Sequence, residues 1–307
     1  MIQVSTIVPV YNGESTIAAA IDNVLNQNFD ATEVIVVNDG STDGTALILR
    51  GYGSKIRVVE QSNRGVSAAR NAGAAIARGE YLAFLDADDE WLPGKLAKAV
   101  LALDRNAAAT LAFSDFIQIG QDGSLDQPSH IGRAPSMDDL LARNWGILPS
   151  SVVMRRRVFE RCGGFREEFR GPGAGEDAYM CLVAREQGEF VYIPEPLIVH
   201  HRPAVVDLLD KYEPGRRIFV ELVRDRYGTA SKALLKDTQQ YFASLALQKA
   251  LQHLDNGNWL RALLQSVRVL SYDPIFFARP QIRSRLFNRK TVALISKLLS
   301  VHRARSG

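Results

Sequence analysis

The chain has 307 residues, of which 46% are hydrophobic, and this composition suits one large globular domain or a domain with an appendage. Its two cysteines, Cys162 and Cys181, exclude a disulfide framework or a zinc knuckle, and no uncharged apolar run approaches the roughly 20 residues of a transmembrane helix. The net charge of +3 is modest and no basic signal segment opens the sequence, so we expect a cytoplasmic protein in a reducing compartment.

Strand and helix patterns alternate through the first hundred residues. Four apolar runs predict strands at Val4 to Val10, Val34 to Val37, Ile56 to Val59 and Tyr81 to Leu85. Helical patterns follow them at Glu14 to Gln27, Thr45 to Arg50, Val66 to Ala77 and Leu92 to Leu103. Strands that are apolar along their whole length are typical of a parallel sheet buried on both faces, so we predict an α/β domain.

Further along, the pattern becomes mixed and then wholly helical. Strands are expected at Leu111 to Ile119, Ser150 to Met154, Phe190 to Ile193 and Leu197 to His201, with helices at Ser136 to Arg143 and Glu176 to Gln187. Helices follow at Val205 to Tyr212, Arg216 to Tyr227, Ser231 to Leu254 and Trp259 to Leu270, and Pro214-Gly215 separates the first two. We therefore predict an α/β domain over residues 1–203 and a helical extension over residues 204–307.

Polar residues follow each of the first four strands. They are Tyr11-Asn12, Asp39-Gly40-Ser41, Asn63-Arg64-Gly65 and Asp86-Ala87-Asp88-Asp89. Ligands of open α/β sheets bind beyond the carboxyl ends of the strands, so these residues mark a candidate site. The sequence has neither a G-x-G-x-x-G after a strand nor a G-x-x-x-x-G-K-[ST], which excludes the usual dinucleotide and P-loop cradles for phosphate.

The acidic run from Asp86 to Glu90 offers another way to hold phosphate. Asp86 and Asp88 would place two carboxylates near one point, and hard oxygen ligands suit Mg²⁺ or Mn²⁺, which commonly bridge a carboxylate to substrate phosphates. The alternative is a solvated loop that caps the following helix. For an isolated motif of this length that alternative would be the more common one.

Five segments together resemble a known family. In chain order they are STIVPVYNGESTIAAAIDNVLNQ, VIVVNDGSTDGT, NRGVSAARNAGAAIARGEYLAFLDADD, CGGF and GED. With this order and spacing the chain resembles the family 2 inverting glycosyltransferases of the GT-A fold, from about Ser5 to Arg202. The resemblance implies a Rossmann-like, mostly parallel central sheet and a nucleotide-diphosphate-sugar donor, with UDP as the expected nucleotide. It does not cover the helical extension.

The resemblance assigns roles in donor binding to residues of the first half. It implies that Pro9, Tyr11 and Asp39 hold the nucleotide base and that Arg70, with Asn63 upstream, also reaches the base. Without the resemblance, Asp39 would be interpreted as a turn residue, because Asn-Asp-Gly-Ser is good turn chemistry, and Arg70 as a surface cation.

The same resemblance implies a metal site of Mn²⁺ or Mg²⁺. Asp86, followed by Ala87, would contact the ribose, and Asp88 would bind the ion that bridges the diphosphate. A histidine often completes this site in the family, and the chain offers His200 and His201 at a strand end. The family's usual Arg-x-His pattern is altered here, which leaves the register open, and we slightly favour His201 over His200.

Catalysis is expected from the Glu176-Asp177 pair. An inverting transfer needs a carboxylate that deprotonates the acceptor hydroxyl, and the resemblance assigns this role to Asp177, with Glu176 as a neighbour that sets the acceptor or the pKa. The alternative is that both acids merely favour the start of a helix. Acceptor contacts are sought between Leu111 and Phe190, where Asn144, Trp145 and Arg170 are candidates.

A basic stretch ends the sequence. From Ile275 to Gly307 there are eight Lys and Arg residues and no acid, which leaves a net charge of −5 for the rest of the chain. Leu286, Leu294, Leu298 and Val301 have helical spacing, so we predict a basic amphipathic helix that contacts an anionic membrane surface. A helix packed on its own domain is about as good an interpretation. The helical extension could also pair two copies in a homodimer.

The leading hypothesis is an inverting hexosyl- or N-acetylhexosaminyltransferase. Its expected partners are a UDP-sugar donor and a glycan or lipid-linked acceptor of the cell envelope or of an exopolysaccharide, and no nucleic acid, because no recognised binding module accompanies the basic charge. The alternatives are a nucleotidyltransferase on a similar sheet, which usually carries a Gly-rich basic loop that is missing here, and a non-catalytic scaffold that binds nucleotide-sugar.

Overall fold

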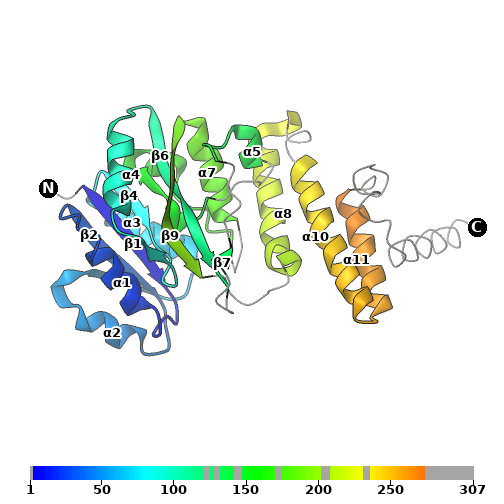
Figure 1. The fold of residues 1–307 in the computed structure, drawn as a ribbon, viewed down its shortest axis with the longest axis horizontal. Helices are drawn as coiled ribbons and strands as arrows, with labels where there is room; N and C mark the ends of the chain where they lie inside the picture. The colour runs from blue at the N-terminus through cyan, green and yellow to red at the C-terminus, as the bar shows by residue number, and fades with distance from the viewer. Residues whose placement is uncertain are drawn as a thin grey trace, which may run out of the picture. The chain divides into compact units, whose positions relative to one another are not determined.

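Two compact units make up the chain, Met1–Val205 and Val206–Gly307. The computed structural model describes residues 3–120, 125–126, 132–141, 147–170, 175–201, 208–230 and 236–273. Within these residues the first unit combines a central sheet with helices, and the second contains helices alone (Figure 1). The division falls two residues beyond the boundary that the sequence predicts. The basic stretch from Ile275 to Gly307 lies outside the described residues, so its predicted helix stays a prediction.

The first half of the sheet is parallel. Its strands are β1 (Val4–Val10), β2 (Thr32–Asp39), β3 (Arg57–Gln61) and β4 (Tyr81–Phe84), in the spatial order β3-β2-β1-β4. Helices α1 (Ile17–Leu25), α2 (Thr45–Gly51), α3 (Val66–Ala75) and α4 (Lys95–Asp104) follow these strands in turn. Every residue of β1 is buried, as its apolar sequence predicts for a strand covered on both faces.

The second half of the sheet mixes directions. It consists of β5 (Glu90–Trp91), β6 (Ala109–Ile119), β7 (Leu125–Asp126), β8 (Val153–Arg155) and β9 (Glu189–His201). The order β4-β8-β6-β9-β5 joins antiparallel neighbours except for the parallel pair of β6 and β9. Helices α5 (Met137–Leu141), α6 (Arg156–Cys162) and α7 (Glu176–Glu186) belong to this half, as does a short 3₁₀ turn at Pro149–Ser151. Another short 3₁₀ turn, Gly53–Lys55, lies between α2 and β3 in the first half.

β9 corrects one expectation from the sequence. Two short strands were expected around Pro194-Glu195-Pro196, but a single strand runs through. The register with β6 steps from the pair Ser114 and Ile193 to the pair Asp115 and Pro196. Two residues are thus accommodated as a bulge, which lets the strand continue despite its prolines.

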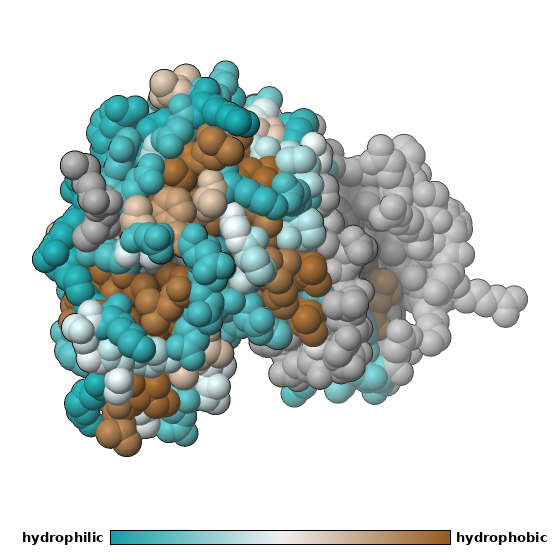
Figure 2. Space-filling view, turned by 60° about the vertical axis from the view of Figure 1, so that its left-hand side comes forward, coloured by the Kyte–Doolittle hydropathy of each residue, from teal (hydrophilic) through white to brown (hydrophobic). Residues whose placement is uncertain are grey.

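The two faces of the sheet are covered by different helices (Figure 1). On one face Val4, Val8 and Val36 pack in a core with α1, α2 and α4. On the other face Gly73 of α3 lies so close to Ile7 that an added Cβ would be 2.6 Å from its Cγ2. On the outer surface drawn in Figure 2, hydrophobic residues form separate patches among hydrophilic ones. The predicted α/β architecture is confirmed.

The second unit contains α8 (Leu208–Tyr227), a 3₁₀ turn (Gly228–Ala230), α10 (Lys236–Asp255) and α11 (Trp259–Tyr272). α8 continues through Pro214, where a break was expected, although proline inside a helix typically costs about 3 kcal/mol. Glu213 supports this turn, because it accepts hydrogen bonds from Arg216 at 3.1 Å, Arg217 at 3.3 Å and the hydroxyl of Tyr272 at 2.6 Å. In the described part of the chain, no helix combines the length and apolar composition needed to cross a membrane.

Lys95 is a buried cation at the start of α4. Lys95 is only 1% exposed, and its Nζ has no hydrogen-bond partner among the residues that the structure describes. The Nζ lies 4.4 Å from the centre of the Trp91 ring. Burial lowers the pKa of Lys95 from 10.5 to about 7. The free energy of folding therefore includes a cost for desolvating this amine, which the aromatic ring offsets in part.

We expect Lys95→Met to raise the free energy of unfolding at pH 7 by about 2 kcal/mol. The lowered pKa corresponds to a cost of about 4 kcal/mol, and a desolvated cation–π contact returns about 2 kcal/mol. Between pH 7 and 10 the unfolded chain binds a proton at Lys95 that the folded chain has released, so the free energy of unfolding of the wild type should rise with pH. The variant should lack this rise. Urea unfolding at pH 7 and pH 9 measures both effects.

Lys98→Met is the matched control for this prediction. Lys98 lies on the same helix, is 43% exposed and pairs with Glu195, so its replacement should change stability by less than about 0.5 kcal/mol. A loss of stability in Lys95→Met at pH 7 would contradict the prediction.

Candidate active site

The register of the parallel strands brings the predicted donor-binding residues to one edge of the sheet. Val10 of β1 pairs with Asn38 of β2, so Tyr11 and Asp39 are neighbours just beyond them. Asp39 pairs with Gln61 of β3, two residues before Asn63. On the other side of β1, Ile7 pairs with Phe84 of β4, two residues before Asp86. The four strand ends thus form one continuous polar edge.

Asp39 is a buried residue of this edge that accepts three hydrogen bonds. Its Oδ1 accepts hydrogen bonds from Gln61 Nε2 at 2.6 Å and from the backbone N–H of Arg64 at 2.9 Å, and its Oδ2 accepts one from the N–H of Gly65 at 2.8 Å. The carboxylate therefore fixes the turn between β3 and α3. Gly65 has a φ of +91°, which only glycine adopts readily. Asp39 therefore acts on this turn, whereas in its own Asn-Asp-Gly-Ser turn Asn38 Oδ1 accepts a hydrogen bond from the N–H of Ser41 at 3.1 Å. The predicted contact of Asp39 with a base stays a prediction.

Tyr11 is the exposed aromatic residue of the edge. Its side chain is 52% exposed, whereas Pro9 is buried in β1. The next residue, Asn12, has a φ of +51°, and it ties the loop after β1 to the loop after β2. Its N–H donates to Ser41 Oγ at 2.9 Å, and its Oδ1 accepts from the N–H of Thr42 at 2.8 Å. Tyr11 thus stands on a braced loop with its ring accessible to a ligand.

Arg70 occupies a place that the sequence did not predict. Its side chain is 2% exposed and bridges two acids, with Nη2 at 2.6 Å from Asp86 Oδ1 and Nη1 at 2.9 Å from Glu176 Oε1. The guanidinium carbon lies 5.2 Å from the centre of the Phe165 ring. Burial by itself would lower the pKa of Arg70, but the two carboxylates raise it above its usual value. Arg70 is therefore not the surface cation of the alternative interpretation but connects the end of β4 to the start of α7, and its predicted contact with a base stays a prediction.

The acidic loop after β4 contains acids in two environments. Asp89 is buried, accepts a hydrogen bond from Ser150 Oγ at 2.5 Å and pairs with Nδ1 of His200 at 2.7 Å. Asp88 is exposed, and its pKa is raised by partial loss of water and by the charges of Asp89 and Asp86. Ser150 also accepts a hydrogen bond from the N–H of Asp86 at 3.1 Å. A cation close to Asp88 would therefore favour the charged form of this carboxyl group.

The two histidines contact different residues of the acidic run, and which of them would meet a metal stays a prediction. Neighbouring residues of a strand point to opposite faces, so the two rings cannot face the same acid. His200 Nδ1 lies 2.7 Å from Asp89 Oδ1, while His201 Nε2 lies 3.1 Å from Glu90 Oε1. Burial would lower the pKa of His200, but Asp89, Asp88 and Asp86 raise it. In the described ranges, no three His, Cys, Asp or Glu side chains are arranged to hold a metal by themselves.

The Glu176-Asp177 pair opens α7 directly after Gly175, whose φ is +91°. Glu176 is buried and engaged by Arg70, whereas Asp177 is half-buried and accepts a hydrogen bond from the N–H of Ala178 at 2.7 Å. Asp177 also borders a small cavity of about 20 Å³ whose other lining residues are apolar apart from Cys181. Of the candidate acceptor contacts, Arg170 is exposed, and Asn144 and Trp145 lie outside the described residues.

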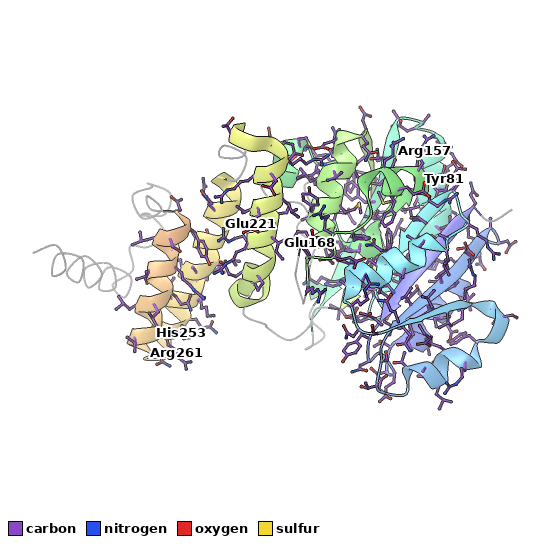
Figure 3. All side chains as sticks on the ribbon, turned by 180° about the vertical axis from the view of Figure 1, so that it is seen from behind. Tyr81, Arg157, Glu168, Glu221, His253 and Arg261 are labelled. Atoms are coloured by element: carbon purple, nitrogen blue, oxygen red, sulfur yellow. The ribbon has the colours of Figure 1, made fainter. Side chains whose placement is uncertain are left out.

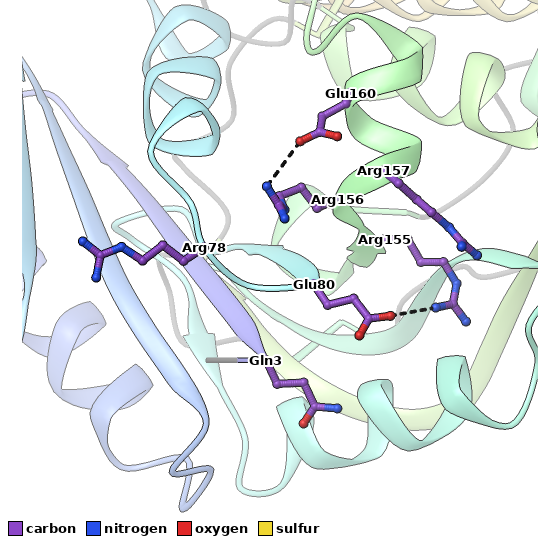
Figure 4. Close-up of a pocket in the computed structure, with 7 residues that line it drawn as sticks. All are labelled: Gln3, Arg78, Glu80, Arg155, Arg156, Arg157 and Glu160. Carbon is purple, nitrogen blue, oxygen red and sulfur yellow. Dashed lines mark hydrogen bonds and ion pairs between the residues drawn. The ribbon is translucent and has the colours of Figure 1, made fainter. Parts of the chain in front are cut away.

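A larger cavity lies at the opposite ends of the strands. It measures about 490 Å³ and is lined by Gln3, Arg78, Glu80, Arg155, Arg156, Arg157 and Glu160 (Figure 4). Gln3 and Glu80 immediately precede β1 and β4, and Figure 3 shows Arg157 at the same end as Tyr81. Glu80 and Glu160 each pair with an arginine at 3.5 Å. Because ligands of such sheets bind at the carboxyl ends, the acidic edge is the better candidate.

Comparison with known proteins finds a family model and several relatives. The sequence model described as Glycosyl transferase family 2 matches residues 5–163. An uncharacterized protein of Mycobacterium tuberculosis is 34% identical over 204 residues, 63% of this chain and 57% of that protein. TuaG of Bacillus subtilis, described as a putative teichuronic acid biosynthesis glycosyltransferase, is 38% identical over 144 residues, 45% of this chain and 56% of TuaG. The chain thus spans little more than half of these relatives.

Solved structures with the same fold are also found. A crystal structure of residues 1–349 of TarS from S. aureus, in complex with UDP-GlcNAc, aligns with a TM-score of 0.64 at 19% sequence identity. The alignment covers 98% of this chain and 92% of that one. This similarity confirms the predicted GT-A fold.

Proposed function

The chain belongs to glycosyl transferase family 2, and we propose that it transfers a sugar from a UDP-linked donor to an acceptor hydroxyl with inversion at the anomeric carbon. The observation that carries the proposal is the bridge made by Arg70. It brings Asp86, at the donor edge of the sheet, together with Glu176, the neighbour of the candidate base. This bridge supports a single site that combines the proposed donor-binding and catalytic residues, which are distant in the sequence.

The donor would lie along the carboxyl edge of the sheet. The exposed ring of Tyr11 offers a surface on which a nucleotide base can stack, and Asn63 is exposed in the loop after β3. Asp86 uses Oδ1 for Arg70 and is 31% exposed, which suits a second contact with a ribose hydroxyl. The complexes of TarS with UDP-GlcNAc and with UDP support a uridine nucleotide as the donor group.

Asp88 and His200 are the residues that would hold Mn²⁺ or Mg²⁺. Asp88 is exposed and lies among like charges. Asp89 engages Nδ1 of His200, an arrangement that orients the ring and leaves Nε2 as the nitrogen for a metal. Two protein ligands are enough for an ion that takes its remaining ligands from water and diphosphate. When bound, the ion would stabilise the charge on the departing diphosphate.

Asp177 would serve as the general base. Glu176 is engaged by Arg70, so Asp177 is the carboxylate of the pair that we assign to the acceptor. As the acceptor oxygen bonds to the anomeric carbon, its proton passes to Asp177 and the bond to the diphosphate breaks. The description of TuaG supports a cell-envelope glycan, free or lipid-linked, as the acceptor class.

A donor screen tests the proposed function. The full chain is incubated with Mn²⁺ and individual UDP-sugars, and released UDP is measured with and without EDTA. We expect one UDP-sugar to be turned over well above the others, with release reduced at least tenfold by EDTA, because the diphosphate leaves as a concentrated negative charge. Release from no nucleotide-sugar, in the presence of envelope glycan acceptors, would contradict a transferase and favour a non-catalytic scaffold.

A further inference from the structure

α11 carries an apolar stripe on its exposed side. Leu260, Leu264, Val267 and Leu270 are 71%, 59%, 55% and 38% exposed and follow the i, i+4, i+7, i+10 spacing of one helix face. The other side of the helix is buried through Ala262, Ser266 and Val269, and α10 is the neighbour with which α11 pairs. The helix is therefore apolar on two sides, and within the described part of the chain only one of them is covered.

The stripe is flanked by positive charge. Arg261 and Arg268, both exposed, each follow a stripe residue and so lie on one border of it. Figure 3 shows Arg261 at the same end of the α10–α11 hairpin as His253. From Asn256 to the end of the sequence, Asp273 is the only acid, and it is buried. α11 thus belongs to a long stretch in which every charged residue apart from the buried Asp273 is basic.

Exposed apolar side chains elsewhere in the described residues do not form such a stripe. The other large ones are Tyr11, Leu25, Leu47, Val58 and Leu101, and they belong to different elements of the first unit. Isolated exposed hydrophobic residues are normal on protein surfaces, whereas a continuous apolar strip bordered by polar residues marks an interaction site.

We propose that the exposed face of α11 docks onto a membrane surface that contains anionic lipids. The leucines and the valine would enter the boundary between headgroups and acyl chains, and Arg261 and Arg268 would contact lipid phosphates. The proposal does not depend on the transfer reaction. It would place the enzyme where lipid-linked glycans are found.

Two other groups could cover this face of α11, a second copy of the chain or residues 286–301, and charge distinguishes them from a membrane. A second copy that paired through the same face would bring Arg261 and Arg268 near their own equivalents, because a two-fold contact uses one surface twice. Residues 286–301 of this chain also have apolar residues at helical spacing, but that stretch is itself basic. Only an anionic surface complements both the apolar stripe and its arginine border.

Vesicle sedimentation with the full chain tests the proposal. Vesicles of phosphatidylcholine with about 30% phosphatidylglycerol are compared with pure phosphatidylcholine at 0.1 M salt, where screening leaves only close contacts. We expect the double variant L264Q/V267Q to partition at least tenfold less onto the anionic vesicles. R261Q/R268Q should lose about tenfold on anionic vesicles and little on neutral ones. L47Q, at a 68% exposed leucine of the first unit, should bind like the wild type.

A second measurement separates docking by α11 from binding by the basic stretch that follows. Leu264→Cys is labelled with a polarity-sensitive dye, with Leu47→Cys as the matched position and labelled wild type as the background. Only the label at position 264 should shift to the blue on anionic vesicles. Unchanged sedimentation of L264Q/V267Q, no shift at position 264, or a dimer in light scattering that this variant abolishes would each overturn the proposal.

Discussion

Asp177→Asn should lower the rate of sugar transfer by about 10²- to 10⁴-fold while UDP binding in the presence of Mn²⁺ stays close to that of the wild type. Asparagine has nearly the same shape as aspartate but cannot take a proton from the acceptor hydroxyl. Asp177 belongs to α7, whereas the residues proposed to hold the donor follow β1, β2 and β4, so the nucleotide site should remain intact. Single-turnover transfer and isothermal titration with UDP measure the two quantities separately.

A matched variant controls for the loss of a helix-terminal acid. Asp138 is exposed in the first turn of α5, and Asp138→Asn removes the same type of charge from the same type of position. Loss of such a charge costs about 0.3 to 1 kcal/mol in stability and should leave transfer unchanged. If Asp177→Asn kept more than about a tenth of the wild-type rate, the general base would have to be another group.

The polar edge of the sheet was predictable because it follows directly from the parallel arrangement of the strands. Once four apolar runs form a parallel sheet, the residues after each run must meet at one edge, and Tyr11, Asp39 and Asp86 do so. The choice between His200 and His201 was less secure, because a shift of one residue along a strand exchanges its faces. The bulge in β9 could not be seen in the sequence, and the alternation there depends on where the two extra residues are placed.

The role of Arg70 depends on contacts that no sequence pattern encodes. Its partner Glu176 is 106 positions away along the chain and belongs to a helix that approaches only when the second half of the sheet has formed. The sequence indicates a cation near the site but not its burial. The continuation of α8 through Pro214 has a similar origin, since the contact of Glu213 with Tyr272 is tertiary and outweighs a local preference.

Arg70→Met should lower the free energy of unfolding by about 3 to 5 kcal/mol. The guanidinium is buried and forms an ion pair with both Asp86 and Glu176, so methionine would leave two carboxylates without their shared partner. Arg70→Lys keeps the charge but has one nitrogen in place of the two that now contact separate acids, and it should recover only part of the loss. Urea unfolding at pH 7 measures each variant.

Arg64→Met controls for the loss of an arginine near the same edge. Arg64 pairs with Glu167 at 2.7 Å, but the two side chains are 55% and 40% exposed, so this ion pair should contribute no more than about 1 kcal/mol. A double-mutant cycle of Arg70→Met with Glu176→Gln adds a stricter condition. Arg70→Met leaves two carboxylates without a cation, and Glu176→Gln removes one of these charges. The double variant should therefore be more stable than the sum of the two single losses predicts.

The folded Arg70→Lys variant links this ion-pair network to function. If Arg70 holds Asp86 and Glu176 together, lysine should reduce transfer at saturating donor and acceptor more than it weakens UDP binding, because the alignment of the two halves is lost while the nucleotide edge persists. Equal stability losses for Arg70→Met and Arg64→Met, or full activity in Arg70→Lys, would mean that the two halves of the site are aligned by the surrounding packing instead.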